Sequence, residues 1–254
     1  MMKTAIIQHV IRWNELEWNL QHITSLLDQQ PGADLYVLAE TFATGFLAEG
    51  SAEKAGVQSQ RIFLWMQQQA HRLDAAIAGS VAAVDENGLL RNRLFFVRPD
   101  GSYDYYDKRH LFGFAGETDE YVAGERRVVV EWRGVRFLLQ VCYDLRFPVF
   151  SRNRGDYDVI IYVANWPARR REVWKTLLKA RALENQCYVV GVNVVGSDKV
   201  CEYAGDSVII DAYGRIVASC TPEMVEVAMA EIDMEELQRF RNKFPVLKDA
   251  DEIK

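Results

Sequence analysis

Residues 128–148, VVVEWRGVRFLLQVCYDLRFP, contain the pattern that decides the fold. Two apolar runs, residues 128–132 and 135–141, lie on either side of the turn Arg133-Gly134, which is typical of a β-hairpin. The second run ends at Cys142, where a polar turn begins. Antiparallel pairing in the middle of the chain predicts a sheet that is not purely parallel.

The segments before and after this hairpin alternate between strand and helix patterns. Near the start, residues 4–10 and 34–39 are predicted strands, and residues 14–29 between them form a predicted helix with Asn14 as its N-cap. This β-α-β order favours sheets that are covered by helices. We therefore predict one α/β domain over residues 1–254, in which two mixed sheets pack together with helices outside. Further strands are expected at residues 75–84, 89–97, 159–164, 188–195, 207–211 and 216–219, and further helices at 58–73, 171–186 and 233–241.

The composition narrows the class of protein. Of the 254 residues 49% are hydrophobic, which excludes whole-chain disorder, and no apolar run reaches the roughly 18 residues that a membrane-spanning helix needs. The net charge of −6 disfavours nucleic acid as the main partner. The N-terminal apolar run stops too early for a signal peptide, so a cytoplasmic protein with reduced thiols is expected. The cysteines and histidines lack metal-ligand spacing and no glycine-rich nucleotide motif occurs, so neither metal nor cofactor is expected.

Three strand-like runs end in a polar residue that the apolar pattern does not require: Glu40, Lys108 and Cys142. Glu40 is either a solvated turn residue or a partly buried carboxylate with a raised pKa, suited to proton transfer. Lys108 taken alone reads as a surface lysine. Cys142 is either a buried structural thiol or a nucleophile. The residue types alone leave these alternatives open.

The turn after Cys142 favours the nucleophile. Asp144 and Arg146 are predicted to form an ion pair that makes this turn rigid, and backbone N–H groups after Cys142 can face a developing anion. His110 offers a Cys–His pair as in papain-like hydrolases, but no cysteine signature of that class surrounds Cys142. The remaining cysteines are predicted to be structural: Cys187, Cys201 and Cys220.

Taken together, these segments resemble the nitrilase, or carbon–nitrogen hydrolase, superfamily. Residues 40–46 (ETFATGF), 108–112 (KRHLF) and 142–148 (CYDLRFP) are similar to its glutamate, lysine and nucleophile segments, and residues 165–167 (NWP) and 181–185 (RALEN) follow as in that family. The resemblance covers nearly the whole chain. It implies a four-layer αββα sandwich that forms a homodimer across the nucleophile-side helices, with a C-terminal tail of roughly residues 243–254 at the interface.

Within the superfamily the chain is most similar to the ω-amidase branch. Cys142 is followed by Tyr-Asp, where true nitrilases carry Trp-Glu, and residues 244–251 (FPVLKDAD) match the end of that branch. Ala39 is a departure, because relatives commonly have proline before the glutamate. The resemblance implies a second glutamate, either Glu117 or Glu120; each also fits a solvated loop.

The resemblance implies hydrolysis of a small carboxamide, such as 2-oxoglutaramate, to acid and ammonia through a thioester, without metal or cofactor. Glu40 acts as the base, Cys142 as the nucleophile, and Lys108 with the Tyr143 backbone N–H as oxyanion donors. Alternatives are an N-carbamoyl amidohydrolase or another small-amide hydrolase of the family, and a non-catalytic dimeric scaffold. Which arginine binds a substrate carboxylate is open. The candidate pocket residues are Phe42, Phe46, Phe114, Tyr143 and Trp166.

Overall fold

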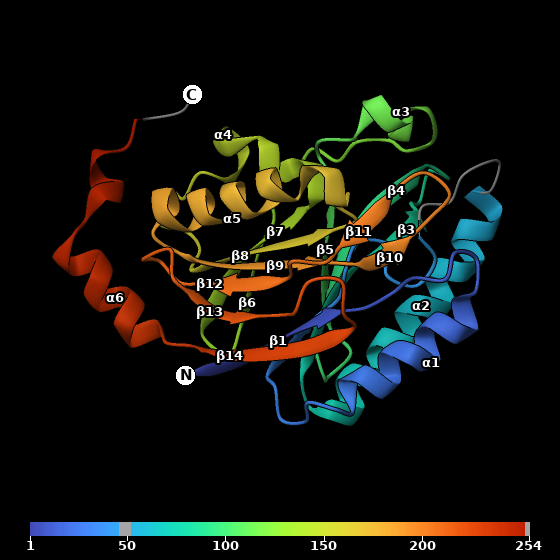
Figure 1. Cartoon of the computed structure of the whole chain (residues 1–254), viewed down its shortest axis with the longest axis horizontal. Helices are drawn as coiled ribbons and strands as arrows, with labels where there is room; N and C mark the ends of the chain where they lie inside the picture. Colours follow the sequence, from blue (N-terminus) through green and yellow to red (C-terminus); the bar gives the residue numbers. More distant parts are fainter. Residues whose placement is uncertain (46–51, 252–254) are drawn as a thin grey trace.

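The computed structural model describes residues 1–45 and 52–251. They form two six-stranded mixed sheets and one short two-stranded sheet (Figure 1). The first sheet has the order β14-β1-β2-β3-β4-β5. Its strands are β1 (Met2–Gln8), β2 (Leu35–Val37), β3 (Ala76–Val84), β4 (Leu90–Val97), β5 (Tyr103–Asp107) and β14 (Glu226–Ile232).

The second sheet has the order β13-β12-β9-β8-β7-β6. The predicted mid-chain hairpin is its β6–β7 pair, in which Trp132 pairs with Val135. Its strands are β6 (Val129–Trp132), β7 (Val135–Val141), β8 (Val159–Ala164), β9 (Tyr188–Asn193), β12 (Val208–Ile210) and β13 (Ile216–Ser219). The short sheet consists of β10 (Val195–Ser197) and β11 (Glu202–Ala204).

Each large sheet combines parallel strands at its centre with antiparallel strands at its edges. In the first sheet, β1, β2 and β3 run parallel, and β4, β5 and β14 add antiparallel strands. In the second, β7, β8 and β9 run parallel, with antiparallel β6 and β12 on either side. Parallel strands need both faces covered, which explains their nearly continuous apolar sequences.

Helices cover the outer face of each sheet and complete the four layers. The helices are α1 (Leu16–Leu27), α2 (Ala52–Leu73), α3 (Glu117–Glu120), α4 (Pro148–Ser151), α5 (Arg171–Asn185) and α6 (Met234–Lys243). Short 3₁₀ turns are η1 (Gly113–Ala115), η2 (Cys142–Arg146), η3 (Ala168–Arg170) and η4 (Val246–Asp249). Figure 1 shows α1 and α2 beside the first sheet and α5 along the second. The αββα architecture is as predicted.

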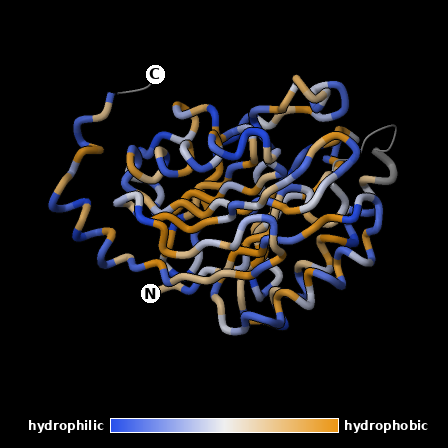
Figure 2. The backbone as a smooth tube through the Cα atoms, in the orientation of Figure 1, coloured by the Kyte–Doolittle hydropathy of each residue, from blue (hydrophilic) through white to orange (hydrophobic). Residues whose placement is uncertain are grey.

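The strand β8 shows how one strand serves two layers. Val159, Ile161 and Val163 belong to the core between the sheets, whereas Ile160 and Tyr162 pack against α5. This alternation follows from the two-residue period of a strand. Figure 2 shows the same arrangement as hydrophobic central strands with more hydrophilic segments around them.

Two predicted helix starts were wrong. Asn14 is not the N-cap: α1 begins at Leu16 with Glu15 as its N-cap, and Asn14 has a left-handed backbone with φ of 66°. Asparagine tolerates that conformation because its short side chain bonds locally, so it serves a turn here. The second helix begins at Ala52, ahead of the predicted residue 58, and includes Gly56, which weakens the helix pattern in the sequence. Over the described residues, no helix is both long and apolar enough to cross a membrane.

Candidate active site

Glu40 is fully buried just beyond the end of β2. Strand pairing continues past β2, because Leu38 N–H donates to the carbonyl of Ala78 at 2.7 Å. The chain then turns at Thr41, which has a positive φ of 42° and whose N–H donates to Ser80 Oγ at 2.9 Å. This turn holds the Glu40 carboxylate between the sheets, where it accepts hydrogen bonds from both.

Lys108 directly follows β5, and its side chain is 1% exposed. Its Nζ lies 2.9 Å from Glu40 Oε1 and 2.8 and 2.9 Å from the two oxygens of Glu117. One ammonium therefore bridges two buried carboxylates. The surface-lysine alternative is wrong.

The second carboxylate at this lysine is Glu117, and Glu120 is exposed. Glu117 begins the short helix α3 after Gly116, whose φ of 79° provides the sharp entry. The N–H of Phe112 donates to Glu117 Oε2 at 2.6 Å and ties the carboxylate to the loop that follows Lys108. The structure thus distinguishes between two residues that the sequence left open.

Two asparagines complete the hydrogen bonding of Glu40, and the sequence analysis missed both roles. Asn92 on β4 donates from Nδ2 to Glu40 Oε1 at 2.8 Å and to Glu117 Oε1 at 3.1 Å. The backbone N–H of Asn165, after β8, donates to Glu40 Oε2 at 2.9 Å. A signal for Asn92 was present: it occupies the apolar face of its strand, in phase with Leu90 and Leu94.

Cys142 lies at the junction between β7 and η2, with a left-handed φ of 43°. The strained backbone turns the chain abruptly at the thiol. Burial and then the charge of Glu40 raise the pKa of the Cys142 thiol well above its usual range, and the Lys108 ammonium opposes this. A hydrogen bond to the Glu40 carboxylate adds to the rise. The thiol therefore keeps its proton at neutral pH, next to a carboxylate that can accept it.

The carboxylate charges also raise the pKa of Lys108, whereas burial acts on it in the opposite direction. Burial lowers the pKa of Lys108, but the charges of Glu40 and Glu117 outweigh it and raise the pKa well above its ordinary value. The ammonium is therefore charged at neutral pH. The structure brings Glu40, Lys108, Glu117 and Cys142 together as one electrostatic group.

The predicted ion pair between Asp144 and Arg146 does not form. Asp144 is fully buried and accepts hydrogen bonds from Val141 N–H (2.9 Å), Tyr106 Oη (2.7 Å) and His110 Nδ1 (2.8 Å). His110 also stacks on Phe147, with ring centroids 3.9 Å apart. A buried carboxylate needs several donors, and these come from two strands and a loop. The turn at Cys142 is thus held by Tyr106 and His110.

The predicted pocket residues occupy different environments. Trp166 is buried beside Trp174, and Tyr143 packs against Phe112 with centroids 4.9 Å apart. Phe42 is fully buried against Trp65 in the core, whereas Phe114 is 87% exposed. Phe46 lies outside the described residues.

Two arginines lie near Phe112 and Trp166: Arg170, which the sequence did not single out, and Arg146, which was predicted to pair with Asp144. The guanidinium of Arg170 is 5.2 Å from the centre of the Phe112 ring, and that of Arg146 is 5.4 Å from the Trp166 ring. Burial and the charges of Arg169 and Arg146 lower the pKa of Arg170. In the described part of the chain, neither Arg170 nor Arg146 has a carboxylate partner within ion-pair distance.

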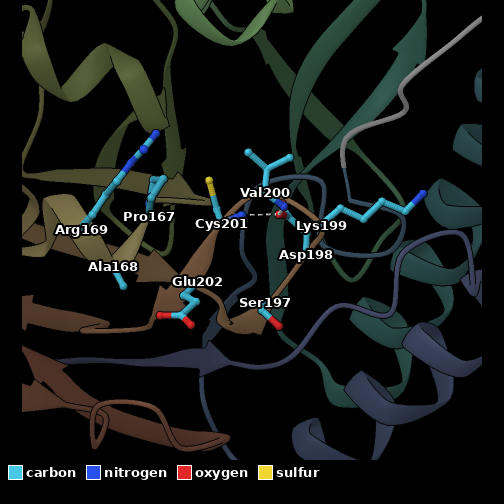
Figure 3. Close-up of a pocket in the computed structure, with 9 residues that line it drawn as sticks. All are labelled: Pro167, Ala168, Arg169, Ser197, Asp198, Lys199, Val200, Cys201 and Glu202. Carbon is cyan, nitrogen blue, oxygen red and sulfur yellow. Dashed lines mark hydrogen bonds between the residues drawn. The ribbon is translucent and has the colours of Figure 1, made fainter.

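A pocket of about 460 Å³ adjoins this region. Figure 3 shows its two walls: Pro167, Ala168 and Arg169 on one side, and the turn from Ser197 to Glu202 on the other. The turn is braced by Asp198, whose Oδ1 accepts the N–H of Cys201 at 2.6 Å and whose Oδ2 accepts the hydroxyl of Tyr203 at 2.7 Å. The β10–β11 hairpin therefore forms a firm border to the pocket.

This fold, with its buried acids and lysine beside a partly buried thiol, defines a class of enzyme. A family model described as carbon-nitrogen hydrolase matches residues 3–242. The chain belongs to the carbon-nitrogen hydrolase family and is a hydrolase that acts on carbon–nitrogen bonds. The family and the fold class predicted from the sequence are confirmed.

Individual relatives are similar over almost the full length. The chain is 48% identical over 253 residues to "Omega-amidase YafV" of Yersinia enterocolitica, covering 99% of this chain and 98% of that protein. It is 34% identical to a "2-oxoglutaramate amidase" of Bacillus subtilis (strain 168), over 85% of each chain. The crystal structure of XC1258 from Xanthomonas campestris, described as a CN-hydrolase superfamily protein with an arsenic adduct in its active site, superimposes with a TM-score of 0.95 at 42% identity, covering 100% of this chain and 98% of that one.

Proposed function

We propose that this hydrolase is an ω-amidase that converts monoamides of short 2-oxo dicarboxylic acids, such as 2-oxoglutaramate, to the diacid and ammonia. The observation that carries the proposal is the Lys108 ammonium held between Glu40 and Glu117 next to the protonated Cys142 thiol. Relatives named as an ω-amidase and as a 2-oxoglutaramate amidase support the choice of substrate.

In the first half of the reaction, Cys142 Sγ forms a bond to the amide carbon and its proton passes to Glu40. Glu40 then gives this proton to the amide nitrogen, the carbon–nitrogen bond breaks, and ammonia leaves behind a thioester. The raised pKa of Cys142 fits this order, because the thiol loses its proton only as the sulfur–carbon bond forms.

In the second half, Glu40 takes a proton from water as the water oxygen attacks the thioester carbon. The sulfur–carbon bond breaks, the sulfur recovers the proton from Glu40, and the carboxylic acid is released. In each half-reaction Glu40 thus accepts one proton and then donates it. Full burial of Glu40 keeps bulk water from competing for that proton.

Both tetrahedral intermediates carry an oxyanion, for which we assign two donors. The first is the Lys108 ammonium, whose raised pKa keeps it charged, and the second is the backbone N–H of Tyr143. Removing one such donor typically costs about 10²–10³ in rate. Glu117 keeps the Lys108 ammonium in place through contacts of 2.8 and 2.9 Å.

A substrate that carries a carboxylate needs a cationic subsite, and Arg170 and Arg146 supply two guanidinium groups without carboxylate partners among residues 1–45 and 52–251. Arg170 is half-buried, so a bound carboxylate meets a partly desolvated charge. This favours an anionic amide over a neutral one.

The test is a screen for ammonia release over 2-oxoglutaramate, 2-oxosuccinamate, glutamine, an N-carbamoyl amino acid and a simple nitrile, with Cys142→Ala as the blank. We expect 2-oxoglutaramate or 2-oxosuccinamate to have the highest kcat/KM, and Cys142→Ala to release no ammonia while melting at the same temperature. A preference for the N-carbamoyl amino acid would replace the ω-amidase by a carbamoyl amidohydrolase. Turnover retained by Cys142→Ala would end the mechanism.

We further propose a single catalytic domain that works as a cytoplasmic homodimer. The support for a dimer is the apolar surface around α4, α5 and the C-terminal segment: Val149 is 59% exposed, Leu183 46% and Phe244 59%. Figure 1 shows α6 at the edge of the molecule on the side of α5, where its Arg241 donates to Asp158 and to the carbonyl of Gln186. Light scattering of the purified protein at twice the monomer mass is expected, and a monomer would contradict this.

A further inference from the structure

We propose that Asn92 is a positioning residue. Its hydrogen bond helps to hold Oε1 of Glu40 in place and leaves the other oxygen, Oε2, to carry the proton. The proposal deepens the mechanism above and rests on Glu40 as the base. It does not depend on which amide is the substrate.

The contacts of Asn92 link the three charged members of the site, Glu40, Glu117 and Lys108. Its side chain donates to Glu40 Oε1 at 2.8 Å and to Glu117 Oε1 at 3.1 Å. Its backbone carbonyl accepts the N–H of Lys108 at 2.9 Å. Asn92 is 1% exposed; it pairs with Ala82 on β3, and the next residue, Arg93, pairs with Asp107 on β5, which fixes the backbone here. A rigid strand therefore determines where the carboxylates meet.

Only an amide can make these contacts at this position. The NH₂ group offers two donors to two carboxylate oxygens without adding charge, whereas a carboxylate would bring a third negative charge into the same space. A second ammonium would compete with Lys108 for both partners. Because the amide is uncharged, the site keeps one positive charge, on Lys108, and two negative charges, on Glu40 and Glu117.

The two oxygens of Glu40 differ in how many donors they already have. Oε1 accepts Lys108 Nζ at 2.9 Å and Asn92 Nδ2 at 2.8 Å, so both of its lone pairs are engaged. Among the described residues, Oε2 accepts only the N–H of Asn165, at 2.9 Å, which leaves one lone pair. A proton arriving from the Cys142 thiol or from water binds where a lone pair remains. Oε2 is therefore the oxygen that moves the proton.

Loss of the Asn92 amide removes one of the two hydrogen bonds that hold Oε1 of Glu40 in place. The carboxylate then has more freedom to rotate, and its charged form is less well stabilised. Both effects act on the proton-transfer step. We expect kcat to fall about 10²-fold with little change in KM, since a misplaced reacting group costs rate more than binding. The acidic limb of the pH–rate profile should move to higher pH, because the remaining contacts stabilise the charged carboxylate less.

The experiment compares Asn92→Ala with Asn153→Ala. Asn153 is a matched control, because it is 2% exposed and its Nδ2 also makes two bonds, to the carbonyls of Tyr157 and Asn185. Both variants lose a buried amide with two hydrogen bonds, so both should melt at lower temperature. Only Asn92→Ala should change kcat and the acidic limb. Asn92→Asp, which keeps the volume and replaces the donor by an acid, should lose more rate than Asn92→Ala.

A second readout needs no amide substrate. Alkylation of Cys142 by iodoacetamide forms a sulfur–carbon bond, releases iodide and passes the thiol proton to Glu40, so its rate against pH follows the same carboxylate. Peptide mass spectrometry of Cys142 gives this rate. Asn92→Ala should shift the acidic limb of alkylation, and Asn153→Ala should leave it in place.

The outcomes separate this proposal from the choice of substrate. If Asn92→Ala shifts the acidic limb of the alkylation rate and the wild type turns over no ω-amide, the role of Asn92 is supported and the ω-amidase is rejected. Normal ω-amide turnover and unshifted limbs in Asn92→Ala would reject the role of Asn92 and leave the ω-amidase intact. Equal melting and kinetic effects in Asn92→Ala and Asn153→Ala would reduce Asn92 to a structural residue.

Discussion

Replacing Glu117 by glutamine removes one of the two charges that hold Lys108 and keeps the size of the side chain. The control is Glu120→Gln, the same change at an exposed position of the same short helix. Because both variants lose one carboxylate from α3, they alter the net charge of the protein equally. Any difference between them reports the contact between Glu117 and Lys108.

The size of the effect follows from the geometry. At 2.8 Å and an effective dielectric constant of about 20, the attraction between Glu117 and Lys108 is about 6 kcal/mol. Folding of the variant no longer requires desolvation of the Glu117 carboxylate, and this offsets roughly half of the lost attraction. The free energy of unfolding is therefore expected to fall by about 3 kcal/mol. For a chain of this size that corresponds to a melting temperature lower by about 6–12 °C.

The pH dependence has a definite sign. The pKa of Lys108 is raised above its ordinary value, so its stabilising contribution is complete below that ordinary value and is lost only as the pH rises through the folded-state pKa. At neutral pH the full contribution is present. In Glu117→Gln the pKa of Lys108 is raised less, and the alkaline limit of activity moves to lower pH.

Calorimetry at pH 7 and the pH profile of ammonia release test this prediction. Glu120→Gln should melt within about 2 °C of the wild type, as expected of a surface change. Glu117→Gln should lose about 10² in kcat/KM, because Lys108, the proposed oxyanion donor, loses its support. Equal melting temperatures for the two variants, or an unchanged alkaline limit in Glu117→Gln, would refute the reasoning.

Three further predictions concern the surroundings of the site. Arg170→Met should raise the KM for 2-oxoglutaramate about tenfold and leave that for propionamide unchanged, since only the former has a carboxylate; equal changes would exclude Arg170 from recognition. Burial lowers the pKa of His9 to about 4, so folded His9 stays neutral and the free energy of unfolding should fall by about 3 kcal/mol between pH 6.5 and 4. Urea unfolding of His9→Gln should show a smaller fall over this pH range. An equal fall in the variant would contradict the prediction. Gly79→Ala should lower the free energy of unfolding by about 1–3 kcal/mol, measured by thermal unfolding. The added Cβ would lie 2.9 Å from atoms of Leu38 and Phe42, which come shortly before and after Glu40 in the sequence. An unchanged melting temperature would show that this strand moves aside easily.

The architecture could be predicted from the sequence because it depends on repeated patterns. The hairpin at Arg133-Gly134 and the β-α-β order of the first segments are local signals, and the buried strands have continuous apolar runs. The start of α1 could not be predicted as reliably. Asn14 satisfies the composition rule for an N-cap, yet a left-handed turn competes for the same residue type.

The site was predicted in part, for a physical reason. Glu40, Lys108 and Cys142 each interrupt an apolar pattern, so they could be singled out one at a time. Which groups contact them depends on how two sheets stack, and this is not a local property. Asp144 was thus assigned to Arg146, its neighbour in sequence, although its partners Tyr106 and His110 come from another strand and loop.

Strand order has a consequence for biosynthesis. In the first sheet β1 lies between β2 and β14, with Met2 opposite Ile232, so β1 can pair with β14 only after residue 232 has been synthesised. The second sheet uses only residues 129–219 and can be assembled from one continuous stretch of nascent chain. Glu40 and Cys142 belong to different sheets, so the base and the thiol are brought together only after both sheets have formed. A polypeptide that stops before β14 therefore leaves one edge of β1 unpaired and the sheet that carries Glu40 incomplete.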